Sequence, residues 1–251
     1  MLNYLKAELY KLLHQRAFCV SLSLLLVLEG MLAVLQRLIG SWDFNRTVAL
    51  LCGGLPAGFF LIYPLGTFVF SEQYKHNTLK NEQAFNFSRQ RIYLGKFFAS
   101  AITCTFVCIL SIGFFLGFSW FLCPNEPGAD AVTGLILLGY CLLIAFPLWL
   151  GALSLLHMLQ FSIKNTTVFT VLYIAYFMAF EPMVWLFANS LTVKPWNDTF
   201  SVLYRVQLST PLSHLTGNLT PILGWAWLVG MGWLVLTTVV GLFLFRKRDI
   251  K

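Results

Sequence analysis

Long apolar runs dominate the chain, and they leave few folds open to it. A helix needs about 20 mainly apolar residues to cross the hydrocarbon layer of a bilayer. About six runs of that length are present: Ala17–Leu38, Leu51–Phe70, Phe97–Leu122, Ala131–Leu159, Thr167–Ala188 and Pro221–Phe245. A membrane β-barrel would need strands that alternate polar and apolar residues, and these runs do not alternate. They predict an all-α polytopic membrane protein with about six transmembrane helices.

Composition and the short polar segments predict the domain organisation. Of the 251 residues, 58% are hydrophobic and only 11% are charged, so most of the chain suits lipid rather than water. The polar segments leave no room for an independent soluble domain. We therefore expect a single transmembrane domain over residues 1–251, in which three segments differ from the spans: 1–16, 71–96 and 189–220.

Basic residues divide unequally between the two sides of the predicted spans. Thirteen of the seventeen lie on one side: Lys6, Lys11, Arg16, Lys75, Lys80, Arg89, Arg91, Lys96, Lys164, Arg246, Lys247, Arg248 and Lys251. Because short cytoplasmic loops carry the excess of Lys and Arg, we expect a multi-pass cell-membrane protein with both termini and segment 71–96 in the cytoplasm. The net charge of +7 then reflects topology and attraction to anionic lipid headgroups, not nucleic-acid binding.

The first sixteen residues have an amphipathic helical pattern. The apolar positions that recur at helical spacing are Leu2, Leu5, Leu9, Leu12 and Leu13. This pattern predicts an interfacial helix that leads into the first span. The alternative is a signal peptide with an apolar core from Ala17 to Leu28. It fits less well, because Glu29 interrupts the run and no small-residue cleavage site follows.

No motif for catalysis or nucleotide binding occurs in the chain. GxSxG, Walker A and GxGxxG sequences are missing, and the six cysteines and four histidines do not have the spacing of a metal site. We therefore expect no enzymatic activity, cofactor or metal in this chain. If the protein uses ATP, another chain must bind it.

Two carboxylates fall inside predicted spans, Glu29 in the first and Glu181 in the fifth. A charged side chain in the hydrocarbon layer costs several kcal/mol unless it faces protein or water, which makes both residues candidates for a substrate path or a gate. The alternative is a partnered carboxylate in a helix interface or near the outer headgroups. Pro182 lacks an N–H group, so we expect the fifth helix to break there.

The segment 189–220 is too apolar for an ordinary loop and too interrupted for a span. Trp196, Phe200, Tyr204 and Leu208 recur at four-residue spacing, which predicts a short amphipathic helix or a re-entrant turn at the outer surface. Such a segment is a candidate outer lid. Two glycine pairs, Gly54/Gly58 and Gly113/Gly117, have the GxxxG spacing that lets helices approach closely.

The order of these segments resembles the type-two ATP-binding-cassette (ABC) permeases. The sharpest likeness lies in the cytoplasmic segment. SEQYKHNTLKN resembles the short coupling helix between the second and third spans of that family, and FSRQRIYLGK resembles the stretch leading into the third span. Ser88 in this stretch is a good N-cap for the following helix. The length and small outer loops are most similar to bacterial exporters of peptide antibiotics, including lantibiotic immunity and bacitracin-type resistance permeases.

The resemblance implies a permease subunit that pairs with a second identical or similar permease and with cytoplasmic ATPase subunits, which bind the ATP. It also implies a set of residues that couple the permease to the ATPase: Glu72, Tyr74, Lys75, Thr78, Leu79 and Lys80. Their mixed charges and apolar anchors suit a protein contact. Two other classes stay open, a non-transporting assembly or scaffold protein and a membrane-embedded enzyme built on Glu29, Glu181 and His157.

Overall fold

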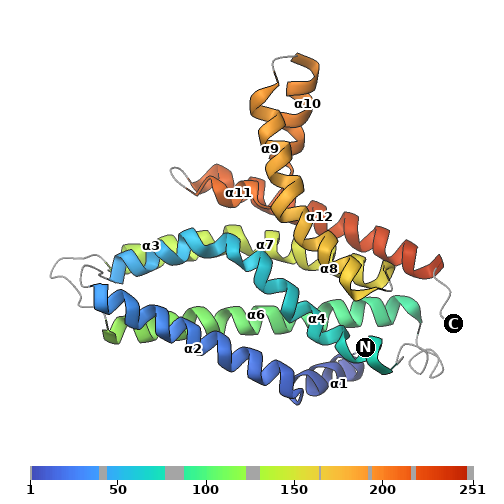
Figure 1. Cartoon of the computed structure of the whole chain (residues 1–251), viewed down its shortest axis with the longest axis horizontal. Helices are drawn as coiled ribbons and strands as arrows, with labels where there is room; N and C mark the ends of the chain where they lie inside the picture. Colours follow the sequence, from blue (N-terminus) through green and yellow to red (C-terminus); the bar gives the residue numbers. More distant parts are fainter. Residues whose placement is uncertain are drawn as a thin grey trace. The chain divides into compact units, whose positions relative to one another are not determined.

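The computed structural model describes residues 2–39, 44–76, 88–122, 131–163, 165–191, 194–215 and 219–247, with the backbone alone at 2, 71–76 and 131. Every regular element in these ranges is helical, which confirms the all-α prediction (Figure 1). The elements are α1 Leu2–Leu13, α2 Arg16–Ile39, α3 Phe44–Gly54, η1 Leu55–Ala57, α4 Gly58–His76, α6 Arg89–Leu122, α7 Ala131–Ser162, α8 Thr166–Ala175, η2 Tyr176–Phe180, α9 Glu181–Ser190, α10 Lys194–Arg205, α11 Thr210–Ser213 and α12 Leu219–Lys247.

Six helical stretches in the described ranges are long and apolar enough to cross a membrane. They are Arg16–Ile39, Phe44–Phe70, Arg89–Leu122, Val132–Ser162, Thr166–Ser190 and Leu219–Lys247. Each corresponds in order to one of the apolar runs predicted from the sequence. The protein is therefore an all-α polytopic membrane protein.

The second span begins at Phe44, earlier than the predicted start at Leu51. Polar residues at this end are buried against a neighbouring helix, and the Thr47 hydroxyl donates a hydrogen bond to Gln36 Oε1 at 3.2 Å. Hydropathy alone excludes such residues from a span. The 3-10 turn η1 contains Pro56, which lacks an N–H group, and it separates α3 from α4.

The third span also begins earlier than predicted, at Arg89 rather than Phe97. Ser88 caps it, because its Oγ accepts a hydrogen bond from Arg91 N at 3.4 Å, and the predicted N-cap is confirmed. At 1.5 Å per residue, the 34 residues of α6 extend about 51 Å, well beyond a hydrocarbon layer of about 30 Å. Part of α6 therefore extends past the apolar layer.

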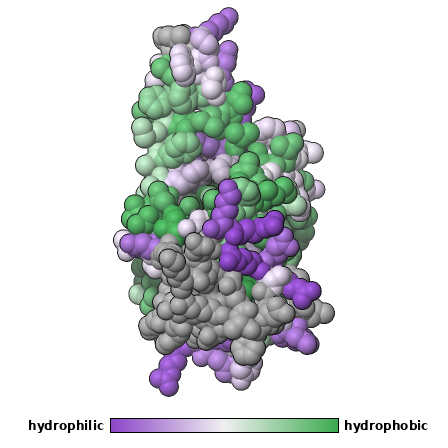
Figure 2. Space-filling model, turned by 90° about the vertical axis from the view of Figure 1, so that its right-hand side faces the viewer, coloured by the Kyte–Doolittle hydropathy of each residue, from purple (hydrophilic) through white to green (hydrophobic). Residues whose placement is uncertain are grey.

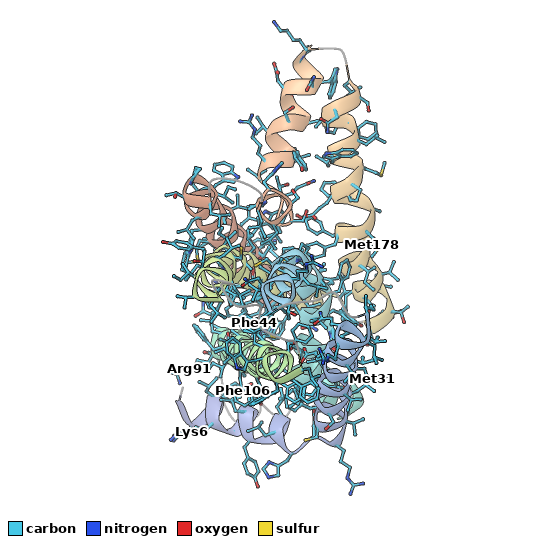
Figure 3. The ribbon with its side chains drawn as sticks, turned by 90° about the vertical axis from the view of Figure 1, so that its left-hand side faces the viewer. Lys6, Met31, Phe44, Arg91, Phe106 and Met178 are labelled. Atoms are coloured by element: carbon cyan, nitrogen blue, oxygen red, sulfur yellow. The ribbon has the colours of Figure 1, made fainter. Side chains whose placement is uncertain are left out.

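Much of the helical surface is apolar and exposed, as the hydrophobic areas in Figure 2 show. Met31 of α2, Phe106 of α6 and Met178 of η2 are labelled in Figure 3, and they are 59%, 52% and 64% exposed. Only 11% of the most apolar stretch of α2 is buried, compared with 44% for the fourth span. A surface of this kind is suited to lipid contact.

The helices form two compact units. The first comprises Met1–Leu55 and Pro64–Tyr140, and in it α1, α2 and α3 all pack against α6. The second comprises Pro56–Tyr63 and Cys141–Lys251. In the second unit α9 packs along α10, and α11 contacts both α10 and α12.

A close crossing of α7 and α12 forms the core of the second unit. A Cβ atom added at Gly230 would collide with the backbone carbonyl of Pro147, so only glycine permits this approach. Two helical turns further along α7, Ser154 is buried and hydrogen-bonded to Thr237 of α12. Backbone proximity combined with a polar contact is a common way for membrane helices to pack.

The two GxxxG pairs have different surroundings. A Cβ at Gly58 would lie 2.6 Å from the Trp149 ring, so this glycine does permit a close contact. Gly54, Gly113 and Gly117 have nothing within 4 Å of the added atom. The tightest crossing uses Gly230, outside either predicted pair.

Candidate functional site

Helix α4 runs without interruption from the second span into the predicted cytoplasmic segment, as far as His76. Glu72, Tyr74 and Lys75 lie in its last turns, where only the backbone is described. The other predicted coupling residues, Thr78, Leu79 and Lys80, lie outside the described residues.

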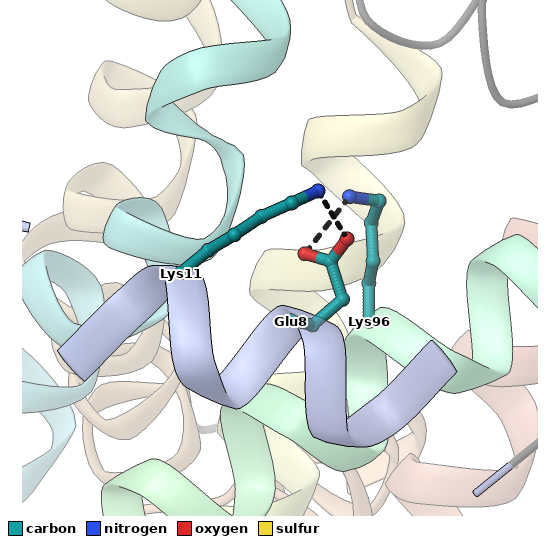
Figure 4. Close-up of polar contacts among 3 residues, drawn as sticks. All are labelled: Glu8, Lys11 and Lys96. Atoms are coloured by element: carbon teal, nitrogen blue, oxygen red, sulfur yellow. Dashed lines mark hydrogen bonds and ion pairs between the residues drawn. The ribbon is translucent and has the colours of Figure 1, made fainter. Parts of the chain in front are cut away.

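The other end of the predicted cytoplasmic segment is held by a buried ionic cluster (Figure 4). Lys96 of α6 is only 2% exposed, and its Nζ lies 3.4 Å from Glu8 Oε2 of α1. Lys11 Nζ lies 3.3 Å from the other carboxylate oxygen of Glu8, and the Lys11 side chain is 52% exposed. The segment's last residue is thus joined to the N-terminal helix.

Sequence reasoning placed Lys11 and Lys96 only as topological charges and passed over Glu8. The sequence did contain a signal that Glu8 has a partner, because Glu8 lies one turn before Leu12 on the apolar side of the helix. An acidic residue on an apolar face needs a partner when that face is buried. Glu8 is 6% exposed, and that partner is supplied by α6.

Close packing of α1 on α6 depends on Gly95. A Cβ at this position would lie 2.6 Å from the ring of Tyr4, so the aromatic ring occupies the space that a side chain would need. The predicted leucine stripe also serves this contact. Leu12 is 3% exposed, and Leu5 and Leu9 are partly buried. Among the leucines of the stripe whose side chains are described, only Leu13 is mostly exposed. The apolar side of α1 therefore packs largely on protein.

Glu29 lies in α2, where it faces α6 within the first unit. Ser111 of α6 donates a hydrogen bond to Glu29 Oε1. The other carboxylate oxygen, Oε2, is buried without a hydrogen-bond partner among the described residues. Near Gly30, the rings of Phe114 and Phe118 of α6 stack 5.6 Å apart, and a Cβ at Gly30 would lie 3.9 Å from each of them, an ordinary contact. One face of the first span thus presents a half-satisfied carboxylate to the third.

Glu181 is the first residue of α9 in the second unit, and it is 4% exposed. Its Oε1 accepts a hydrogen bond from Ser209 N at 3.3 Å. The two candidate carboxylates therefore belong to different units. Glu29 is hydrogen-bonded to Ser111 of α6, and Glu181 is hydrogen-bonded to Ser209, which follows α10. Glu181 ties the fifth span to residues Val206–Ser209, which we call the outer linker after the side predicted for segment 189–220.

Aromatic residues of α12 hold the outer linker from another side. Trp233 Nε1 donates to the carbonyl of Val206 at 2.7 Å, and Trp225 Nε1 donates to the carbonyl of Arg205 at 2.9 Å. Leu208 is fully buried, and its Cδ2 would lie 2.9 Å from a Cβ added at Gly151 of α7. The linker is thus fastened by α7, α9 and α12 together.

The prediction that the fifth helix breaks at Pro182 is wrong. The chain stays helical through α9, and the irregularity is the π-helical segment η2 that precedes it. Pro182 cannot donate to the carbonyl four residues earlier and crowds it, so the wider turn of η2 accommodates the proline. Tyr176, the first residue of η2, has its ring 5.6 Å from Trp233. The distorted turn therefore contacts a helix that holds the outer linker.

The helix predicted in the outer segment is present as α10, which folds back along α9. The ring of Phe200 lies 5.3 Å from that of Phe187, and Asn197 Nδ2 donates to the carbonyl of Leu191 at 3.1 Å. Another face of α10 holds three exposed charged residues at helical spacing, Lys194, Asp198 and Arg205. None of the three forms an ion pair within the described part of the chain.

The remaining polar groups have mainly structural surroundings. His157 is fully buried, with its ring 5.3 Å from that of Phe161. Cys104 and Cys108 are free thiols on one side of α6. In the ranges that the structure describes, no group of three or more His, Cys, Asp or Glu residues is arranged to hold a metal ion.

Comparison of the chain with protein-family models and with curated protein sequences gives no match.

Proposed function

We propose that the chain is the membrane-spanning permease subunit of an ATP-driven ABC exporter. Separate cytoplasmic ATPase subunits bind the ATP, and a second identical or similar permease completes the path. In this proposal the exported molecule is a peptide antibiotic or another amphipathic compound, and the chain itself is not an enzyme. Both termini lie in the cytoplasm, as does the segment 71–96.

The observation that carries the proposal is the connection of this cytoplasmic segment to the helices on either side. It enters as a direct continuation of α4 and ends at Lys96, which is bonded to Glu8 of α1. A displacement of the segment is therefore transmitted to two spans and to the N-terminal helix. If the segment were loosely attached, a movement of the ATPase would not be transmitted to these helices.

The outer linker suits the role of a gate on the other side. From Thr166 at the start of the fifth span, Glu181 lies about 22 Å along the helix, inside an apolar layer of about 30 Å. Helix α10 returns to the level of Glu181, so Arg205 lies at a similar depth. An exposed charge at that depth is costly unless it faces water or protein. The face of α10 that carries Lys194, Asp198 and Arg205 therefore borders an aqueous vestibule.

The test is association with the ATPase that co-purifies from native membranes. Tyr74→Ala and Leu79→Ala should each reduce co-purification and ATPase stimulation, while the amount of inserted permease stays at the wild-type level. Leu38→Ala is the matched control, because Leu38 is 75% exposed and lies at the other end of the first span. If association and transport are unchanged in both variants, the docking surface lies elsewhere.

A further inference from the structure

One face of α1, together with the first residue of α2, is not used for packing in the first unit. Lys6 and Arg16 are exposed, and so are Tyr10 and Leu13, at 64% and 54%. We call these four residues the basic face. The opposite side of α1, with Leu12 and Glu8, is buried. The basic face therefore remains available to a partner after α1 has docked.

The level of this face along α6 follows from two contacts. Tyr4 packs at Gly95, and Glu8 is bonded to Lys96. The apolar run of α6 begins at the next residue, Phe97. Helix α1 thus lies where the polar start of α6 meets its apolar part, which is the level of lipid headgroups.

Charge on this face is not cancelled locally. Glu8 is the only acidic residue among positions 2–16, and it is already engaged with Lys11 and Lys96. Within the described part of the chain, neither Lys6 nor Arg16 forms an ion pair.

We propose that the basic face binds the anionic phosphate headgroups of the cytoplasmic leaflet. Lys6 and Arg16 contact the phosphates, while Tyr10 and Leu13 enter the glycerol and upper acyl region. Long cationic side chains and aromatic rings are favoured at that depth, and each cation near an anionic surface adds attraction. The binding fixes α1 on the membrane, and it does not depend on whether the protein transports anything.

The experiment uses the purified full chain in neutral detergent, titrated with phosphatidylglycerol or phosphatidylcholine, with bound lipid measured by native mass spectrometry. The double variant Lys6→Gln/Arg16→Gln should bind phosphatidylglycerol about 25-fold more weakly, about fivefold per cation, with binding of phosphatidylcholine unchanged. The matched control is Lys194→Gln/Arg205→Gln, which also removes two exposed cations and should behave as wild type. Glycerol 3-phosphate at the same concentration should displace neither lipid.

Four results would overturn the proposal. Wild-type preference for phosphatidylglycerol in the Lys6→Gln/Arg16→Gln variant would show that the basic face does not contact the lipid. An equal loss in the control would indicate a general effect of net charge. Displacement by glycerol 3-phosphate would identify a soluble phosphate as the ligand, and loss of ATPase co-purification with intact lipid binding would assign the face to a protein.

Discussion

Replacing Glu8 tests the ionic cluster that joins α1 to α6, and the three members of the cluster should differ in cost. Glu8→Gln takes the carboxylate from two cations at once, one of them the buried Lys96. Removing one partner of a buried ion pair costs about 3–5 kcal/mol. We expect the lower end, about 3 kcal/mol, because Lys96 has a further interaction and Lys11 can turn to water.

The other two substitutions should cost less. Lys96→Met leaves Glu8 paired with Lys11 and fills the same space with an apolar chain, which we expect to cost about 1–2 kcal/mol. Lys11→Gln removes a half-exposed cation and should cost less than about 1 kcal/mol. The double variant Glu8→Leu/Lys96→Met replaces both buried charges by apolar groups and should recover most of the stability lost in Glu8→Gln.

The assay is thermal unfolding of the purified chain in detergent, with all variants in the same buffer. At about 2 °C per kcal/mol for a chain of this size, the Tm should fall by about 6 °C in Glu8→Gln and by about 2–4 °C in Lys96→Met. The order of the three single variants is the critical result. If Lys11→Gln is as destabilising as Glu8→Gln, or if the double variant is the least stable of all, the assignment of the cluster is wrong.

Three further predictions concern the glycine contact and the two intramembrane carboxylates. Gly95→Ala should lower the stability by about 1–3 kcal/mol, and Tyr4→Leu should restore part of it because the clash involves the Tyr4 ring; failure of the second change to help would refute that contact. Glu181→Ala should speed hydrogen exchange at the Ser209 amide about tenfold, since a hydrogen bond of about 1.4 kcal/mol is lost, whereas unchanged exchange would show that Glu181 does not hold the outer linker. Glu29→Gln keeps an acceptor for Ser111, so insertion should match wild type while transport changes; transport at the wild-type level would make Glu29 a structural residue.

Hydropathy predicted the six spans because a run of about 20 apolar residues has few other uses. It failed at the ends of spans, where tertiary partners decide the boundary. Thr47 belongs to a span because Gln36 accepts its hydrogen bond, and Lys96 lies within α6 because Glu8 neutralises it. These partners are far apart in the sequence, so no local window can reveal them.

The sequence revealed some residues of the candidate site but not the residues they contact. Glu29 and Glu181 stood out as carboxylates inside apolar runs, and α10 was visible from its aromatic spacing. The partners of these residues were not predictable, because Ser111 and Ser209 are ordinary polar residues with no motif around them. The same holds for Gly230, whose neighbour Pro147 comes from another helix. Helix packing in a membrane depends on such small local fits rather than on a sequence pattern.

The central claim is that this chain is a powered subunit without nucleotide chemistry of its own. The most direct measurement is ATP hydrolysis by the purified chain in lipid nanodiscs, before and after addition of the ATPase that co-purifies from native membranes. Binding of the ATP phosphates requires a glycine-rich loop that opens a helix, and the sequence has no such loop. We predict no hydrolysis by the chain alone, and hydrolysis coupled to export once the ATPase is added. Turnover by the chain alone that survives removal of trace contaminants would contradict the account.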